Sequence, residues 1–208
     1  MELKYGTWKI SSYEPADARA LCAAGFSPIT AALLCSRGYR DADAAREFLS
    51  CSYPLSSPFD LLDMDKAAAR VKQALSRREH IAVFGDYDVD GITATCLLTE
   101  YLRSKGGHVT SYIPARLEEG YGLNPIAIDT LKKQGVELIV TVDCGITANH
   151  EAALCRELGI DLVITDHHEC KSELPQAIAL VDPHRKDQPQ PAGCRHRGRA
   201  GNASGSIL

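Results

Sequence analysis

The sequence has no surplus of positive charge and no long apolar segment. Its 208 residues carry a formal charge of −4, which argues against a protein that holds nucleic acid by a general excess of Lys and Arg. No stretch approaches the ~18 consecutive apolar residues of a membrane span, and the opening residues MELKYGTWKI lack the apolar run of a signal peptide. We therefore predict a cytoplasmic protein without a membrane segment.

Paired cysteines and aromatic residues are also scarce. The eight cysteines are scattered, and no two form a C-x-x-C pair, which argues against a zinc module or a disulfide framework and for a reducing compartment. Aromatic residues make up 6% of the chain, but 45% hydrophobic and 24% charged residues are ordinary values for a globular protein. The sequence therefore predicts a packed core.

The first 78 residues have the pattern of a helical segment. Residues 14–50 show helical spacing, with breaks at residues 25–28 and at Gly38, which predicts two or three short helices. A connector rich in Ser and Pro follows at residues 51–60, and residues 63–78 then predict one amphipathic helix. We interpret residues 1–78 as a helical lead-in that packs on the domain that follows it.

From residue 79 to residue 187, short apolar runs alternate with helical segments. The predicted strands are residues 81–84, 108–113, 137–142, 162–165 and 178–181, and the predicted helices between them are residues 92–105, 125–134 and 148–158. The strands are apolar throughout, which is typical of a parallel sheet buried on both faces. The predicted fold class is α/β, a parallel sheet with helices on both faces.

Acidic loops follow three of these strands. They read GDYDVDG at residues 85–91, DCG at 143–145 and DHHE at 166–169. In an open parallel sheet, ligands bind beyond the carboxyl ends of the strands. The three loops are therefore expected to meet at one site.

The carboxylates of the first loop, Asp86, Asp88 and Asp90, repel one another and need a counter-charge. Oxygen ligands joined by one or two imidazoles suit Mg²⁺ or Mn²⁺. A solvated acidic turn or a calcium loop are the alternatives. An EF-hand needs a Glu about six residues after the Gly, and Cys96 and Leu97 stand in that region instead.

The residues of the other two loops are ambiguous when each is taken alone. An Asp such as Asp143 before a helix is commonly an N-cap, and the pair His167 and His168 could lie on the surface. Their positions after strands, beside further acidic loops, favour metal binding and catalysis.

Together the three loops carry a family resemblance. The stretches GDYDVDGITAT, VTVDCGIT and ITDHHE, in this order and at these separations, resemble motifs I, II and III of the DHH phosphoesterases. Residues 111–124 and 57–66 resemble in particular the RecJ group of single-strand DNA exonucleases within that family. The likeness covers roughly residues 15–187.

The resemblance implies a two-metal site that holds Mn²⁺ or Mg²⁺. It implies that Asp88, Asp90 and His167 bind metal, that Asp143 bridges the two ions, and that His168 faces the scissile phosphate. Asp86 and Asp166 would be ligands themselves or partners that hold the ligands and assist catalysis. Some members have a His at the position of Phe84, so one ion would lose a nitrogen ligand here.

The resemblance also implies a substrate. A RecJ-like enzyme would degrade single-stranded DNA from a 5′ end during DNA repair and recombination, as a monomer, with single-strand-binding protein and a repair helicase as partners. Arg116 is the predicted contact to the substrate phosphate, and a surface ion pair with Glu118 or Glu119 is the alternative. Tyr121 is predicted to stack on a base, or else to be a turn residue.

The chain departs from the family pattern after Asp187. A fourth motif with another metal-binding Asp, and a second domain, are expected but do not appear. We interpret the irregular residues 188–208 as the product of a frameshift or truncation, and the alternative is a basic arm that includes Arg195, Arg197 and Arg199. Two other functions therefore stay open: a non-catalytic binding module, and a phosphodiesterase for short oligoribonucleotides or cyclic dinucleotides.

Overall fold

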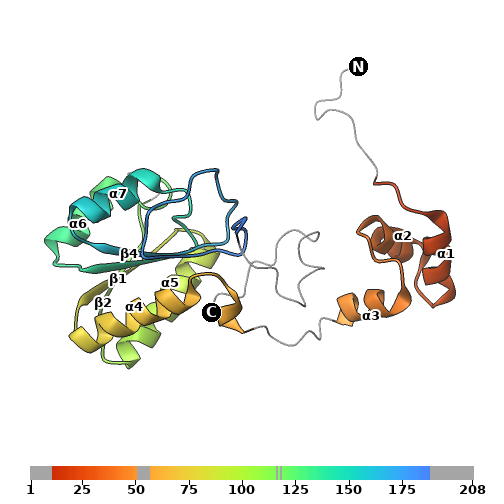
Figure 1. The fold of residues 1–208 in the computed structure, drawn as a ribbon, viewed down its shortest axis with the longest axis horizontal. Coiled ribbons are helices and arrows are strands. Elements are labelled where there is room, and N and C mark those ends of the chain that lie inside the picture. Colours follow the sequence, from red (N-terminus) through yellow and green to blue (C-terminus); the bar gives the residue numbers. More distant parts are fainter. Residues whose placement is uncertain (1–10, 51–56, 116, 118, 188–208) are drawn as a thin grey trace, which may run out of the picture. The chain divides into compact units, whose positions relative to one another are not determined.

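The computed structural model describes residues 11–50, 57–115, 117 and 119–187 (Figure 1). These residues form two compact units, one within residues 11–50 and the other from residue 57 onward. The predicted tail at 188–208 and most of the predicted connector lie outside the described residues. Within the described segments, no helix combines the length and apolar character needed to cross a membrane.

The N-terminal unit consists of three short helices, α1 (Pro15–Ala23), α2 (Pro28–Ser36) and α3 (Ala42–Ser50). The side chain of Ser27 caps α2 by accepting a hydrogen bond from the backbone of Thr30. The helices enclose a small core in which Leu21 and Leu34 are buried. The predicted breaks fall at the two turns between these helices, so three helices form as expected.

The second unit contains a five-stranded sheet in which every strand pair is parallel. The strand order is β2-β1-β3-β4-β5. The strands are β1 (His80–Gly85), β2 (His108–Tyr112), β3 (Leu138–Val142), β4 (Asp161–Thr165) and β5 (Ala179–Val181). All residues of β1 and β3 are buried, because these central strands are covered on both faces. The predicted α/β fold class is confirmed.

Helices cover both faces of the sheet, as Figure 1 shows. On one face α6 (Pro125–Lys133) and α7 (Asn149–Glu157) pack against alternate strand residues such as Phe84 and Ile139. On the other face α4 (Met64–Arg77) and α5 (Val89–Ser104) pack against the intervening residues, which include Val83 and Val140. Two apolar cores therefore hold the strand ends in place.

Two boundaries differ from the sequence-based predictions. Helix α4, which the prediction assigned to the lead-in, lies in the same compact unit as the sheet and contacts β5. Helix α5 begins at Val89, three residues earlier than predicted, because the side chain of Asp88 caps its first turn. Asp90 therefore lies in a helix and not in an open loop.

Candidate metal centre

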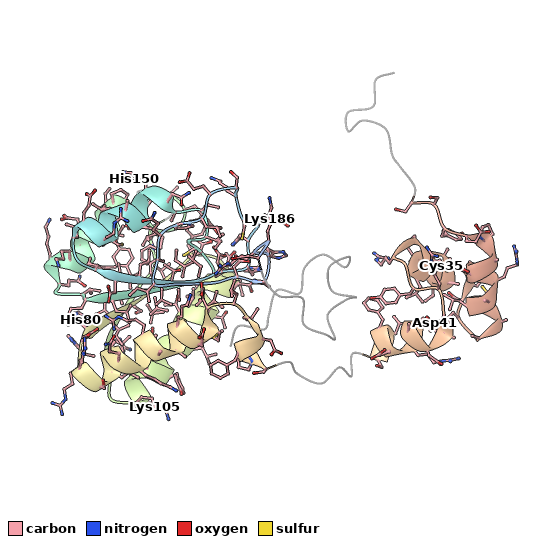
Figure 2. All side chains as sticks on the ribbon, viewed as in Figure 1. Cys35, Asp41, His80, Lys105, His150 and Lys186 are labelled. Carbon is pink, nitrogen blue, oxygen red and sulfur yellow. The ribbon has the colours of Figure 1, made fainter. Side chains whose placement is uncertain are left out.

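Four aspartates form one row at the carboxyl edge of the sheet. The strand registers pair Gly85 with Val142, Val142 with Thr165, and Thr165 with Val181. The next residue along each of these four strands is an aspartate, and the row reads Asp86, Asp143, Asp166 and Asp182. Figure 2 shows the direction of the sheet: His80, which begins β1, and Lys186, which follows β5, lie at its opposite ends.

The strand order makes this edge a natural binding place. The chain passes from β1 outward to β2 and then returns to β3 on the other side of β1. The loops that follow β1 and β3 therefore diverge, and such a point is where ligands bind in open α/β sheets. Asp86, Asp166 and Asp182 are each at most 2% exposed. Buried carboxylates this close together need positive charge nearby.

The loop after β1 is fixed by the start of helix α5. Asp88 Oδ1 accepts hydrogen bonds from the backbone nitrogens of Asp90, at 2.9 Å, and Gly91, at 3.0 Å. The bond from Gly91 is the largest cause of a lowered pKa of Asp88. The negative charge of Asp88 acts on Asp143, so these two carboxylates lie near each other although they come from different strand ends.

Gly91 allows this first helical turn to approach the strand end. A Cβ atom at Gly91 would lie 2.6 Å from the backbone nitrogen and oxygen of Asp86. Backbone atoms cannot move aside as a flexible side chain can. Any larger residue at this position must therefore push the turn, and Asp88 with it, away from the edge.

We predict that Gly91→Ala destabilises the chain by about 1–3 kcal/mol, the usual cost of overpacking. Urea denaturation followed by circular dichroism measures this loss. Cys96→Ala is the control, because Cys96 is an exposed residue of the same helix. If both variants unfolded at the wild-type urea concentration, the close approach would be wrong.

Asp143 and His167 form the centre of the cluster. His167 Nε2 lies 2.7 Å from Asp143 Oδ1. Asp143 adopts a left-handed backbone conformation with φ of 60°, which is uncommon outside Gly, Asn and Asp. Burial raises the pKa of Asp143, and the charge of Asp88 adds to that effect while His167 opposes it. The carboxylate therefore lies where positive charge would stabilise it.

Asp166 holds the second histidine. Its Oδ1 lies 2.7 Å from His168 Nδ1 and accepts the backbone N–H of His167, while its Oδ2 accepts the backbone N–H of Ile146 at 2.9 Å. Burial alone would lower the pKa of His168, but the hydrogen bond and charge of Asp166 outweigh it and raise that pKa. Nε2 of His168 faces the hydroxyl of Tyr121 at 3.3 Å.

The donor atoms fit a divalent cation. One atom each from Asp143, His167 and His168 lies within 4.8 Å of the other two. Asp143 Oδ2 is also buried and has no hydrogen-bond partner among the described residues. A buried oxygen without a partner is costly unless a cation or a proton satisfies it. Carboxylate and imidazole donors together suit Mn²⁺, and Mg²⁺ through the oxygens.

Other predicted residues lie at the margin of this cluster. Asp86 is in the row, and its Oδ1 accepts the backbone N–H of Tyr87 at 2.5 Å. Asp90 lies in the exposed first turn of α5, and no described contact joins its side chain to Asp143. Phe84 is buried and stacks on Tyr112 in the core. The predicted phosphate contact Arg116 lies outside the described residues.

One residue of the row, Asp182, was not among the residues predicted from the sequence. It follows β5 as the other three aspartates follow β1, β3 and β4, and it is fully buried. The same rule of an aspartate directly after an apolar strand would have found it. That signal was weak because β5 has only three residues.

A family comparison agrees with this geometry. Residues 80–197 match the model of the DHH family, N-terminal domain. The chain belongs to the DHH family. The matched range includes all four aspartates of the row and both histidines, so the predicted family membership is confirmed.

Within this family, the chain resembles exonucleases named RecJ. It is 46% identical over 158 residues to the single-stranded-DNA-specific exonuclease RecJ of Bacillus subtilis, a match that spans 76% of this chain and 20% of that relative. Two solved structures are similar. A RecJ bound to manganese has a TM-score of 0.58 and 36% identity over 65% of this chain and 36% of that one. A RecJ in complex with Mn²⁺ from Thermus thermophilus has a TM-score of 0.60 and 29% identity over 86% of this chain and 26% of that one.

Proposed function

We propose that this chain carries the metal-binding part of a RecJ-like exonuclease that hydrolyses phosphodiester bonds of single-stranded DNA. The observation that carries the proposal is the convergence of Asp88, Asp143, His167 and His168 from three strand ends onto one partly exposed cluster. The chain spans about one fifth of the length of its B. subtilis relative. The activity of the whole protein is therefore part of the proposal.

The proposed cofactors are Mn²⁺ or Mg²⁺, with Asp143, Asp88 and His167 as the residues that hold them. Bound divalent cations supply Lewis acidity and lower the pKa of water, as in other nucleases. Relatives of known structure contain manganese, and the imidazole of His167 beside a carboxylate favours Mn²⁺ over Mg²⁺. From the family pattern, Asp90 and Asp86 are proposed as further metal ligands or as residues that hold the ligands in place.

The proposed task of His168 is to contact the phosphate. Asp166 Oδ1 accepts a hydrogen bond from Nδ1 of His168, so the ring keeps one orientation. Nε2 then faces outward, where a substrate oxygen could replace the Tyr121 hydroxyl. A proton on Nε2 would neutralise charge that develops on the phosphate during hydrolysis. Asp166 acts through His168 and is proposed as a positioning residue.

Tyr121 is the proposed contact to a base. Its side chain is 54% exposed, and its ring stands edge-on to both Tyr87 and His168, with centroids 6.0 Å and 6.1 Å away. An exposed ring beside the cluster can stack on a base of any sequence. With Arg116 as the proposed phosphate contact, the acidic chain would bind DNA through these individual side chains and not through a general positive charge.

The described cysteines are all free thiols, which fits the proposed cytoplasmic location.

Degradation assays test the proposed function. Purified chain with Mn²⁺ should release mononucleotides from long single-stranded DNA and leave blunt duplex DNA intact. Cyclic dinucleotides and short oligoribonucleotides are the competing substrates. Faster turnover of these small substrates would replace the proposal with a sister activity. Saturable Mn²⁺ binding without hydrolysis of any substrate would support a non-catalytic module.

A further inference from the structure

We propose that Asp182 is a positioning residue of the metal centre whose negative charge, held beside Asp166, strengthens the binding of divalent cations. This inference rests on the proposed metal site, but it assigns a role to a residue outside the three motifs that indicated that site. Four structural observations support it.

The first observation is the position of Asp182 in the aspartate row. Thr165 pairs with Val181 in the parallel register of β4 and β5, and the backbone nitrogen of Asp166 donates to the carbonyl of Val181 at 3.0 Å. Asp182 is therefore the immediate neighbour of Asp166 across the sheet. Any change in its charge acts directly on the residue that orients His168.

The second observation is an unsatisfied oxygen. Asp182 is fully buried, and its Oδ1 accepts the backbone N–H of His184 at 2.7 Å. Its Oδ2 is buried and has no hydrogen-bond partner in the part of the chain that the structure describes. An asparagine could accept the same bond from His184 through its amide oxygen. The turn itself therefore does not require a carboxylate.

The third observation is the set of charges around Asp182. The groups that act on it are Asp166, which is negative, and His184 and His167. Burial first, and then the charge of Asp166, raise the pKa of Asp182 to about 6. Two buried carboxylates side by side destabilise each other unless a cation offsets their charge. Divalent ions at the cluster would provide that positive charge.

The fourth observation is the rigid segment that holds Asp182. Arg185, only 8% exposed, donates to the carbonyl of Leu180 at 2.6 Å and to Asp63 Oδ2 at 2.7 Å. It also forms an ion pair with Asp187 at 2.7 Å. These bonds tie the residues on both sides of Asp182 to the start of α4. The segment that carries Asp182 is therefore held in place, with the residue buried beside Asp166.

Two measurements on Asp182→Asn test the proposal. Titration with MnCl₂ by calorimetry should show an affinity lower by about 10–100-fold, the range found when partners of metal ligands are lost. Thermal unfolding without metal should occur at the wild-type temperature or above it, because the substitution removes a buried repulsive charge and keeps the bond from His184. Asp129→Asn is the control, since Asp129 is an exposed residue of α6 that forms an ion pair with Lys133.

The outcomes separate this inference from the proposed function. If the wild-type chain showed no saturable heat with Mn²⁺, the metal site itself would be wrong. If the wild type and Asp182→Asn bound Mn²⁺ equally, only the role of Asp182 would be overturned. A variant that lost both affinity and metal-free stability would show that Asp182 serves the fold alone, which also overturns the inference.

Discussion

Replacing Asp143 with asparagine is expected to abolish saturable Mn²⁺ binding and, with it, the proposed hydrolysis of single-stranded DNA. Asp143 contacts His167 directly, neighbours Asp88, and contributes a buried oxygen without a hydrogen-bond partner among the described residues. Asparagine keeps the shape and tolerates the left-handed backbone at this position. The substitution therefore removes the charge and leaves the loop intact.

For Asp143→Asn, calorimetric titration with MnCl₂ measures metal binding, and release of mononucleotides measures hydrolysis. Circular dichroism should give the spectrum of the wild type, because the core beneath the site is unchanged. Asp129→Asn removes a carboxylate from the exposed face of α6 and should leave both functions intact. Full activity of Asp143→Asn would defeat the metal assignment.

Replacing His168 with alanine is expected to slow hydrolysis by roughly 10²–10⁴-fold, the usual contribution of a positioned acid or base. Binding of Mn²⁺ should change little, because Asp143 and His167 remain. Initial rates at saturating DNA, measured beside a metal titration of the same variant, separate these two effects. Tyr121→Phe is the matched comparison, since it removes only the hydroxyl that lies 3.3 Å from His168 Nε2.

A different outcome for His168→Ala would assign the residue another role. The donor atom of His168 lies within 4.8 Å of those of Asp143 and His167, so direct metal binding by this histidine is geometrically accessible. If His168→Ala lost Mn²⁺ affinity to the same extent as hydrolysis, His168 would be identified as a metal ligand. The proposed contact to phosphate would then have to come from another residue.

The sheet was predictable because its strands carry an unambiguous pattern. Most residues of β1 and β3 are apolar without alternation, which is typical of a sheet buried on both faces. Since parallel strands all end at the same edge, the convergence of Asp143 with His167 followed from the fold alone. The cluster confirms that part of the expectation.

The finer arrangement depended on interactions that a sequence pattern does not encode. Asp88 caps α5, so the helix begins at Val89. The position of this start depends on the side chain of Asp88 bonding to nearby backbone N–H groups. Phe84 stacks on Tyr112 from a neighbouring strand, a contact that the sequence does not show. Asp182 follows an apolar strand as the other three aspartates do, but only the register of β4 and β5 shows that it lies beside Asp166.

Carboxylates from separate strand ends gather closely enough to hold a divalent ion. Diffraction from crystals of the chain soaked in MnCl₂, recorded near the manganese absorption edge, tests this arrangement. We predict an anomalous peak within coordination distance of both Asp143 and His167. A map without a peak there, or a structure in which these two side chains lie apart, would contradict it.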